Sequence, residues 1–158
     1  MKSPFDDLHI DRALVSEFFA TFARFEYAMK ARGFCRRDRF GNALPDWNEL
    51  KGQLGGPISA AVTSCETSAY LLEEPPQVQK YVGGYPEFKA VSLAGATVGA
   101  QALEAAKRVR NNLFHGGKHT PHSSPERDTR LIRGALNVLD ACLKANANLQ
   151  TEFEQQVF

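Results

Sequence analysis

The spacing of apolar residues in the first thirty positions constrains the fold of this chain more than any other feature. The residues Leu14, Phe18, Phe22, Phe25 and Met29 follow one another at intervals of four, four, three and four. This spacing places one continuous apolar stripe on a single face of an α-helix. Seven of the eleven phenylalanines lie between positions 5 and 40. The helix is therefore expected to supply much of the hydrophobic core and to end near Gly33.

Three later stretches show the same helical period. The first contains the row Ile58, Val62, Cys65, Ala69 and Leu72, which predicts that Cys65 is a small core residue. The second is expected to run from about Ser92 to His115, with the apolar row Val98, Ala102, Ala105, Val109 and Leu113. The last begins with Ser124 as N-cap and Pro125 at the first helical position, and is expected to reach about Asn148.

Glycine and proline separate these stretches. Residues 34–45 are expected to form a loop, after which a capping box of Asp46 and Glu49 predicts a short helix through about Leu54. The segment Gly55-Gly56-Pro57 is expected to break the chain. Beyond Pro75-Pro76 we expect an irregular loop, with a short hairpin flanked by Val78 and Val82 as the alternative.

These patterns predict an all-α fold, with residues 1–158 forming a single-domain helical bundle of four to five helices. One long irregular loop is expected around residues 75–92. The chain is 43% hydrophobic and 23% charged, which is typical of a globular domain. Its net charge of +1 argues against a basic nucleic-acid coat and an acidic tail, but it allows a local basic site.

The sequence also bears on where the protein works. No apolar run is long enough to span a membrane, and the first residues lack the apolar core of a signal peptide. Cys35, Cys65 and Cys142 are isolated thiols with no CxxC pair. We therefore expect a cytoplasmic protein with no membrane contact and no disulfide framework.

The segment from Lys107 to His119 is the part of the sequence most informative about function. It contains the permanent cations Lys107, Arg108, Arg110 and Lys118, together with His115 and His119. No acidic residue lies between Glu104 and Glu126. A nearly neutral chain thus carries one concentrated positive site.

Two residues of this segment have specific chemical roles to offer. Arg110 interrupts an otherwise apolar row, so it needs an acidic partner or an anion. A structural pair with Asp128 or Asp140 and a functional role are equally supported by the sequence. His115 ends its helix before two glycines, where the helix dipole favours the imidazolium. It is either a general acid and base, or a capping residue without a catalytic task.

The stretch Arg110-Asn111-Asn112-Leu113-Phe114-His115 resembles the signature of HEPN domains, an Arg followed by a polar residue and separated from a His by four to six residues. Arg108 also satisfies the spacing, but the apolar Val109 follows it, so Arg110 fits better. The wider segment from residue 71 to residue 143 resembles uncharacterised bacterial HEPN-like proteins. The resemblance covers about the last ninety residues. Gly117 stands where HEPN toxins silenced by a nucleotidyltransferase antitoxin carry Tyr, so the resemblance does not extend to that mode of control.

The resemblance implies a metal-independent endoribonuclease of a toxin or defence type that needs no cofactor. RNA is then the substrate, and its 2′-hydroxyl attacks the adjacent phosphate at a composite site between two protomers of a homodimer. His115 moves protons, Arg110 holds and stabilises the phosphate, and Asn111 orients either His115 or a phosphate oxygen. Flanking contacts to the RNA backbone are expected from Lys107, Arg108, Lys118 and His119. An antitoxin or another regulatory protein is a further partner to test for.

Two other classes of function stay open. A non-catalytic HEPN-like module can bind RNA, a nucleotide or a partner protein with the same basic residues. Alternatively, His115, His119 and His122 can form a metal site, although they have no Cys or acidic neighbour. Loss of RNA cleavage in a His115→Ala variant distinguishes the enzyme from the binding module.

Overall fold

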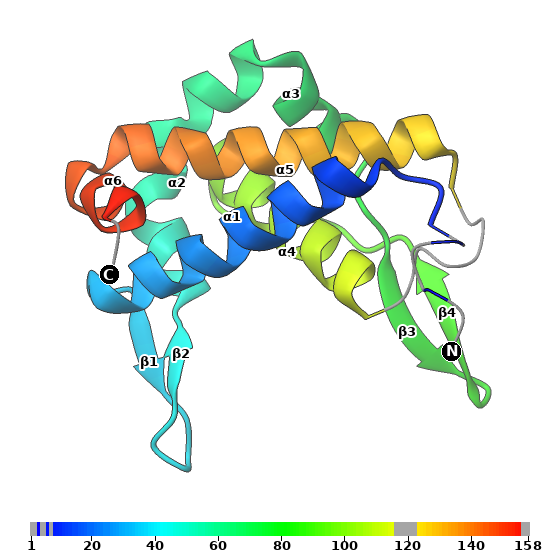
Figure 1. Cartoon of the computed structure of the whole chain (residues 1–158), viewed down its shortest axis with the longest axis horizontal. Coiled ribbons are helices and arrows are strands. Elements are labelled where there is room, and N and C mark those ends of the chain that lie inside the picture. Colours follow the sequence, from blue (N-terminus) through cyan, green and yellow to red (C-terminus); the bar gives the residue numbers. More distant parts are fainter. Residues whose placement is uncertain (1–2, 4–5, 7, 116–122, 156–158) are drawn as a thin grey trace.

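The computed structural model describes residues 3, 6, 8–115 and 123–155, and this part of the chain is mostly helical. Six helices and two antiparallel hairpins follow one another along it (Figure 1). The helices are α1 (Arg12–Ala31), α2 (Trp47–Ser64), α3 (Glu66–Glu73), α4 (Val98–Phe114), α5 (Pro125–Ala145) and α6 (Ala147–Glu154). The strands are β1 (Cys35–Arg37), β2 (Ala43–Pro45), β3 (Val78–Val82) and β4 (Tyr85–Lys89). The helical class is as predicted, but the helices are more numerous than the four to five expected.

Helix α1 confirms the aromatic stripe. Its N-cap is Asp11, whose carboxylate accepts a hydrogen bond from the backbone N–H of Leu14 at 2.8 Å. The chain leaves the helix through Gly33, whose φ of +91° favours glycine. The buried residues of the helix are Leu14, Phe18, Phe22, Phe25, Ala28 and Met29.

The loop predicted for residues 34–45 is a β-hairpin, so that prediction is wrong. Strand β1 pairs with β2 in the register Cys35↔Pro45, Arg36↔Leu44 and Arg37↔Ala43. Asp38 shapes the turn because its carboxylate accepts hydrogen bonds from the backbone N–H groups of Phe40 and Asn42, both at 2.8 Å. Strands of three residues are too short to show a two-residue alternation in the sequence.

Helix α2 continues through Gly55-Gly56-Pro57, where the sequence predicts a break. Tertiary packing explains the difference, because the glycines let α2 cross α4 at close range. A Cβ on Gly55 would lie 2.7 Å from Thr97 Oγ1, and one on Gly99 would lie 2.1 Å from the carbonyl oxygen of Gly55. The hydroxyl of Ser59 also accepts a hydrogen bond from the N–H of Gly99 at 3.0 Å.

The predicted row through Cys65 is divided between α2 and α3. Cys65 lies between the two helices with an extended backbone (ψ 117°) and is only half-buried. It is therefore not the core thiol that the spacing predicts. The buried thiol is that of Cys142 on α5.

The remaining boundaries differ from the predicted ones mainly before α4. Residues 78–89 form the hairpin β3–β4, with Gly83 and Gly84 at its turn, so the irregular loop expected around residues 75–92 is wrong. The alternative of a hairpin is right in kind but not in its bounds, because Val78 and Val82 are the two ends of strand β3. Helix α4 starts at Val98 with Thr97 as its N-cap, six residues later than predicted for Ser92. Helix α5 begins as predicted, since the Ser124 hydroxyl accepts a hydrogen bond from the N–H of Arg127 at 3.2 Å.

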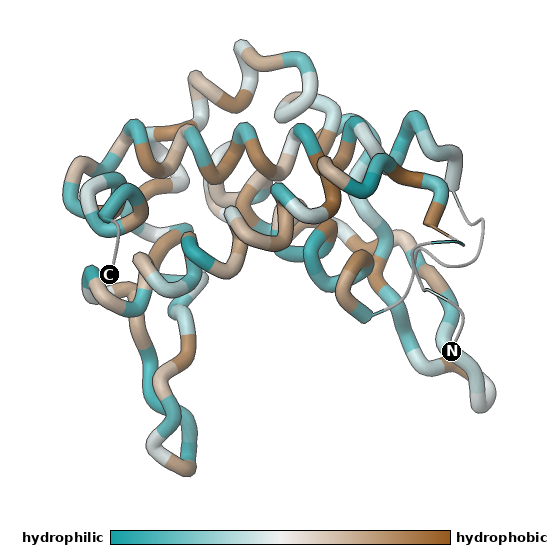
Figure 2. The backbone as a smooth tube through the Cα atoms, viewed as in Figure 1, coloured by the Kyte–Doolittle hydropathy of each residue, from teal (hydrophilic) through white to brown (hydrophobic). Residues whose placement is uncertain are grey.

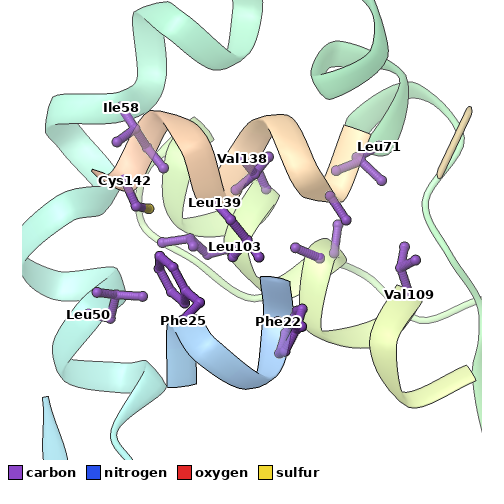
Figure 3. Packing of buried hydrophobic residues seen from close by; sticks show 14 of the residues in the cluster. Phe22, Phe25, Leu50, Ile58, Leu71, Leu103, Val109, Val138, Leu139 and Cys142 are labelled. Atoms are coloured by element: carbon purple, nitrogen blue, oxygen red, sulfur yellow. The ribbon is translucent and has the colours of Figure 1, made fainter. Parts of the chain in front are cut away.

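The core lies where the helices meet. Figure 3 shows residues from α1, α2, α3, α4 and α5 converging, among them Phe22, Leu103 and Leu139. Hydrophilic and hydrophobic residues alternate along the helices (Figure 2), as amphipathic helices around a common core require. Both hairpins project from the same side of the helical body (Figure 1). None of the helices in the described ranges has the length and apolarity that a membrane span requires.

Candidate functional site

The candidate site lies at the C-terminal end of α4. Thr97 caps the start of the helix. One face of the helix is lined by small buried residues that pack against α2 and α5, and this packing fixes the direction in which the later side chains of α4 point. The buried row continues beyond the alanines with Arg108, Val109 and Asn112. His115 is the C-cap, and its backbone N–H donates to the carbonyl of Asn111 at 2.9 Å.

Arg110 faces α1 and has an acidic partner there. Its Nη2 forms a salt bridge with Oε1 of Glu26, and the guanidinium lies 5.2 Å from the centre of the Phe22 ring. The two charged side chains are 28% and 20% exposed, so the pair is partly shielded from water. The partner belongs to the first helix rather than the last, where the sequence suggested Asp128 or Asp140.

Asn111 connects Arg110 with the surface that carries His115. Its side-chain oxygen accepts a hydrogen bond from Arg110 Nη1 at 2.9 Å. Asn111 and His115 also line one surface pocket of about 210 Å³. The other lining residues of that pocket are Gln77, Val78, Gln79, Arg108 and Asn112.

Arg108 has a structural environment. Its side chain is 9% exposed, and it donates hydrogen bonds to the carbonyl oxygens of Val91 at 2.5 Å and Ser92 at 2.7 Å. These bonds tie the segment before α4 to the helix. The predicted contact of Arg108 with an RNA backbone stays a prediction, and this burial does not favour it.

Lys107 points toward α2 and joins a small charge cluster. Glu104 is its centre, with Lys51 Nζ at 3.1 Å, Lys107 Nζ at 3.6 Å and Arg108 Nε at 3.7 Å from the carboxylate oxygens. Burial by itself raises the pKa of Glu104, but Lys107, Lys51 and Arg108 together hold that pKa below its ordinary value. The carboxylate stays ionised, and the cluster keeps a net positive charge.

The structure therefore brings together only part of the predicted site. Residues five apart on an α-helix point about 140° away from each other around its axis, and α4 stays helical through Phe114. Arg110 and His115 consequently face different sides of α4, and Asn111 lies between them. Lys118 and His119 lie outside the described residues, so their predicted roles remain predictions.

Several residues of this region cannot be predicted from the motif. Glu26 neutralises Arg110, and Gln77 with the first two residues of β3 forms one wall of the pocket. Asn112 fixes that wall, because its buried side-chain amide donates to the carbonyl of Gln77 at 2.8 Å. Only Glu26 has a signal in the sequence, since it is a carboxylate beside the apolar stripe of α1 and thus needs a partner.

The exposed imidazole of His115, the amide of Asn111 and the guanidinium of Arg110 offer proton transfer, hydrogen bonding and anion binding along one helix end. This set suits chemistry at a phosphate or acyl group that develops negative charge. Metal chemistry at His115 would need His119 and His122, which lie outside the described residues. Within the part that the structure describes, no three His, Cys, Asp or Glu side chains gather as a metal site requires.

Comparison with known proteins adds no assignment. Neither protein-family models, nor curated proteins, nor solved structures gave a match to this chain.

Proposed function

We propose that this protein is a metal-independent endoribonuclease of the HEPN type, of a toxin or defence kind. The observation that carries the proposal is the shared pocket of Asn111 and His115, with Arg110 bonded to the Asn111 amide. A pocket of about 210 Å³ at a helix end admits a phosphodiester group and part of a ribose, but not a folded substrate. The resemblance of residues 110–115 to the HEPN signature gives the same assignment.

The proposed reaction uses the RNA itself as nucleophile. The neutral imidazole of His115 accepts the proton of a 2′-hydroxyl as its oxygen bonds to the adjacent phosphorus. The P–O5′ bond then breaks, and a proton from imidazolium reaches the leaving 5′-oxygen. The products end in a 2′,3′-cyclic phosphate and a free 5′-hydroxyl. DNA lacks the 2′-hydroxyl and is not cut.

Arg110 supplies the positive charge in this proposal. A guanidinium has five N–H donors, and the bonds to Glu26 and Asn111 leave donors for phosphate oxygens. Because Arg110 and His115 diverge on one helix, the phosphate is held between two protomers of a homodimer. A two-fold contact presents the same segment from both sides, so each site combines residues of both chains.

The test compares wild type, His115→Ala and Arg110→Ala on a short RNA in EDTA, with products read by mass spectrometry. We expect cleavage by wild type alone, with cyclic phosphate ends. Circular dichroism checks that both variants fold, as expected for residues outside the core. Products with a 5′-phosphate, activity that requires added metal, or full cleavage by His115→Ala would overturn the mechanism. Light scattering at micromolar concentration tests the dimer, and a strict monomer contradicts the composite site.

The salt bridge between Arg110 and Glu26 favours a second function, a non-catalytic module that binds RNA, a nucleotide or a partner protein. In that case Arg110 is structural, and its partner on α1 is the reason that it stands in an apolar row. RNA binding without cleavage by wild type, unchanged in His115→Ala, supports this alternative.

A further inference from the structure

The hairpin β1–β2 carries chemistry that the site on α4 does not use. It extends from the helical body on the side where the second hairpin also projects (Figure 1). Its turn, residues 38–42, joins strands of only three residues each. The exposed side chains of the hairpin include Arg36, Arg37, Arg39 and Phe40.

The positive charge of this hairpin is available to a ligand. No carboxylate in the described ranges forms a salt bridge with Arg36, Arg37 or Arg39. Asp38, the acidic residue of the turn, accepts hydrogen bonds from the amide of Asn42 at 2.9 Å and from two backbone N–H groups. These bonds, led by the Asn42 side chain, lower the pKa of Asp38. Its carboxylate is thus engaged within the turn.

The tip also presents an aromatic ring beside the charges. Phe40 is 74% exposed, and the guanidinium carbon of Arg39 lies 4.5 Å from the centre of its ring. The guanidinium of Arg37 reaches the turn as well, since its Nε lies 3.7 Å from where a Cβ on Gly41 would stand. Two cations and an open aromatic face therefore meet at the tip.

Protection of the sheet edges explains part of this pattern. Charged side chains on short exposed strands prevent edge-to-edge pairing with another chain. That need does not explain an aromatic ring at the tip, because an exposed Phe there promotes association instead. A surface that combines unpaired arginines with an exposed ring matches the requirements of single-stranded nucleic acid, whose phosphates and unstacked bases need both.

We propose that the tip of the β1–β2 hairpin binds a single-stranded segment of RNA outside the cleavage site. Arg37 and Arg39 contact successive phosphates, and a base stacks on Phe40. Duplex RNA binds less well, because its bases are already stacked on one another. The choice of RNA as the ligand rests on the proposed function, whereas the cationic and aromatic binding surface rests on the hairpin alone.

The test measures binding of a fluorescent 20-nucleotide 2′-O-methyl RNA of unstructured sequence at several salt concentrations. This probe lacks the nucleophile, so binding is measured whether or not the protein cleaves RNA. Each phosphate neutralised on a single strand contributes about 0.7 to the slope of log affinity against log salt. Arg37→Gln with Arg39→Gln should lower the slope by about 1.4. If the two contacts contribute nothing at 1 M salt, the variant should bind the RNA about 25-fold more weakly than wild type at 0.1 M salt.

A second variant separates stacking from charge. Phe40→Ala should weaken binding at least about fivefold and leave the salt slope unchanged. Replacing Arg37 and Arg39 by Lys should preserve the slope. The matched control, Arg133→Gln with Lys144→Gln on α5, removes the same number of charges from exposed positions and should bind as wild type. Equal loss in control and hairpin variants, or wild-type binding by the hairpin variants, overturns the proposal.

Two further outcomes distinguish this inference from the proposed function. If wild-type protein cleaves unmodified RNA and the hairpin variants bind the 2′-O-methyl strand as wild type does, RNA binding by the hairpin is refuted and the ribonuclease proposal is not. If the protein binds the 2′-O-methyl strand through the hairpin but does not cleave unmodified RNA, RNA binding by the hairpin is supported and the ribonuclease proposal is refuted. Duplex RNA bound as tightly as the single strand refutes the stacking role of Phe40.

Discussion

The salt bridge between Arg110 and Glu26 can be dissected by a double-mutant cycle. The carboxylate of Glu26 accepts from Arg110 and also from the indole N–H of Trp47 at 3.2 Å. A fully exposed pair contributes about 0.2–1 kcal/mol, whereas removal of one partner of a buried pair costs about 3–5 kcal/mol. With side chains 28% and 20% exposed, this pair lies between those limits. We expect a coupling free energy of about 1–2 kcal/mol.

Urea unfolding of wild type, Glu26→Ala, Arg110→Ala and the double variant measures this coupling. Glu26→Ala should be the more destabilising single change, because it also leaves the Trp47 N–H without its acceptor. A coupling free energy below about 0.5 kcal/mol would show that the pair is not a structural element. Such a result would remove the structural explanation for an arginine in this row.

Glu26→Gln tests whether Glu26 competes with the RNA phosphate for Arg110. The amide oxygen still accepts from Trp47, while the negative charge that competes for Arg110 is lost. If Arg110 holds a phosphate, kcat/KM for RNA should rise about fivefold, the equivalent of about 1 kcal/mol of released competition. A drop in kcat/KM with unchanged stability would refute the idea that Glu26 competes with the substrate.

Three further results are expected. Gly99→Ala should destabilise the protein by about 1–3 kcal/mol in urea unfolding, because the new Cβ would lie 2.1 Å from the Gly55 carbonyl oxygen. Ala is otherwise the better helix former, so a stabilised variant would refute the close crossing of α2 and α4. Phe22→Ala should cost about 3–5 kcal/mol, since the ring is 1% exposed and stacks on Trp47; a loss under 1 kcal/mol would contradict its burial. Hydrogen bonds from Ser68 and Thr67 lower the pKa of Cys65 to about 7, and burial raises that of Cys142 to about 12. Iodoacetamide should therefore label Cys65 with a midpoint near pH 7 and spare Cys142, and mass spectrometry showing the reverse order would refute both environments.

The Cys65 thiolate also gives the protein a pH-dependent stability with a defined sign. The folded thiol loses its proton near pH 7, whereas the ordinary thiol keeps it until about pH 9.0. Between these values the unfolded state binds more protons, so this contribution to the free energy of unfolding grows as pH rises from 7 to 9. Cys65→Ser should remove that rise in urea unfolding at pH 7 and pH 9. A rise of equal size in the variant would assign it to other groups.

The features of the fold that depend on neighbouring residues can be predicted from the sequence alone. The aromatic stripe of α1, the Ser124 cap and the start of α5 depend on residues within one or two helical turns of each other. Helical periodicity and capping act over that range, so they leave a clear pattern. The basic end of α4 was visible for the same reason, as a run of charges with no acid nearby.

Contacts between distant segments decided the rest. Helix α2 passes through Gly55-Gly56-Pro57 because close packing on α4 outweighs the local preference for a break. The partner of Arg110 lies 84 positions earlier in the chain, and the wall beside His115 comes from a hairpin held by Asn112. Spacing along one helix predicts which residues share a face, but only tertiary structure decides what that face meets. That is why the motif pointed to Arg110, Asn111 and His115 but not to the residues around them. Only the structure determined that Arg110 and His115 face apart, and that Glu26 and residues 77–79 lie beside them.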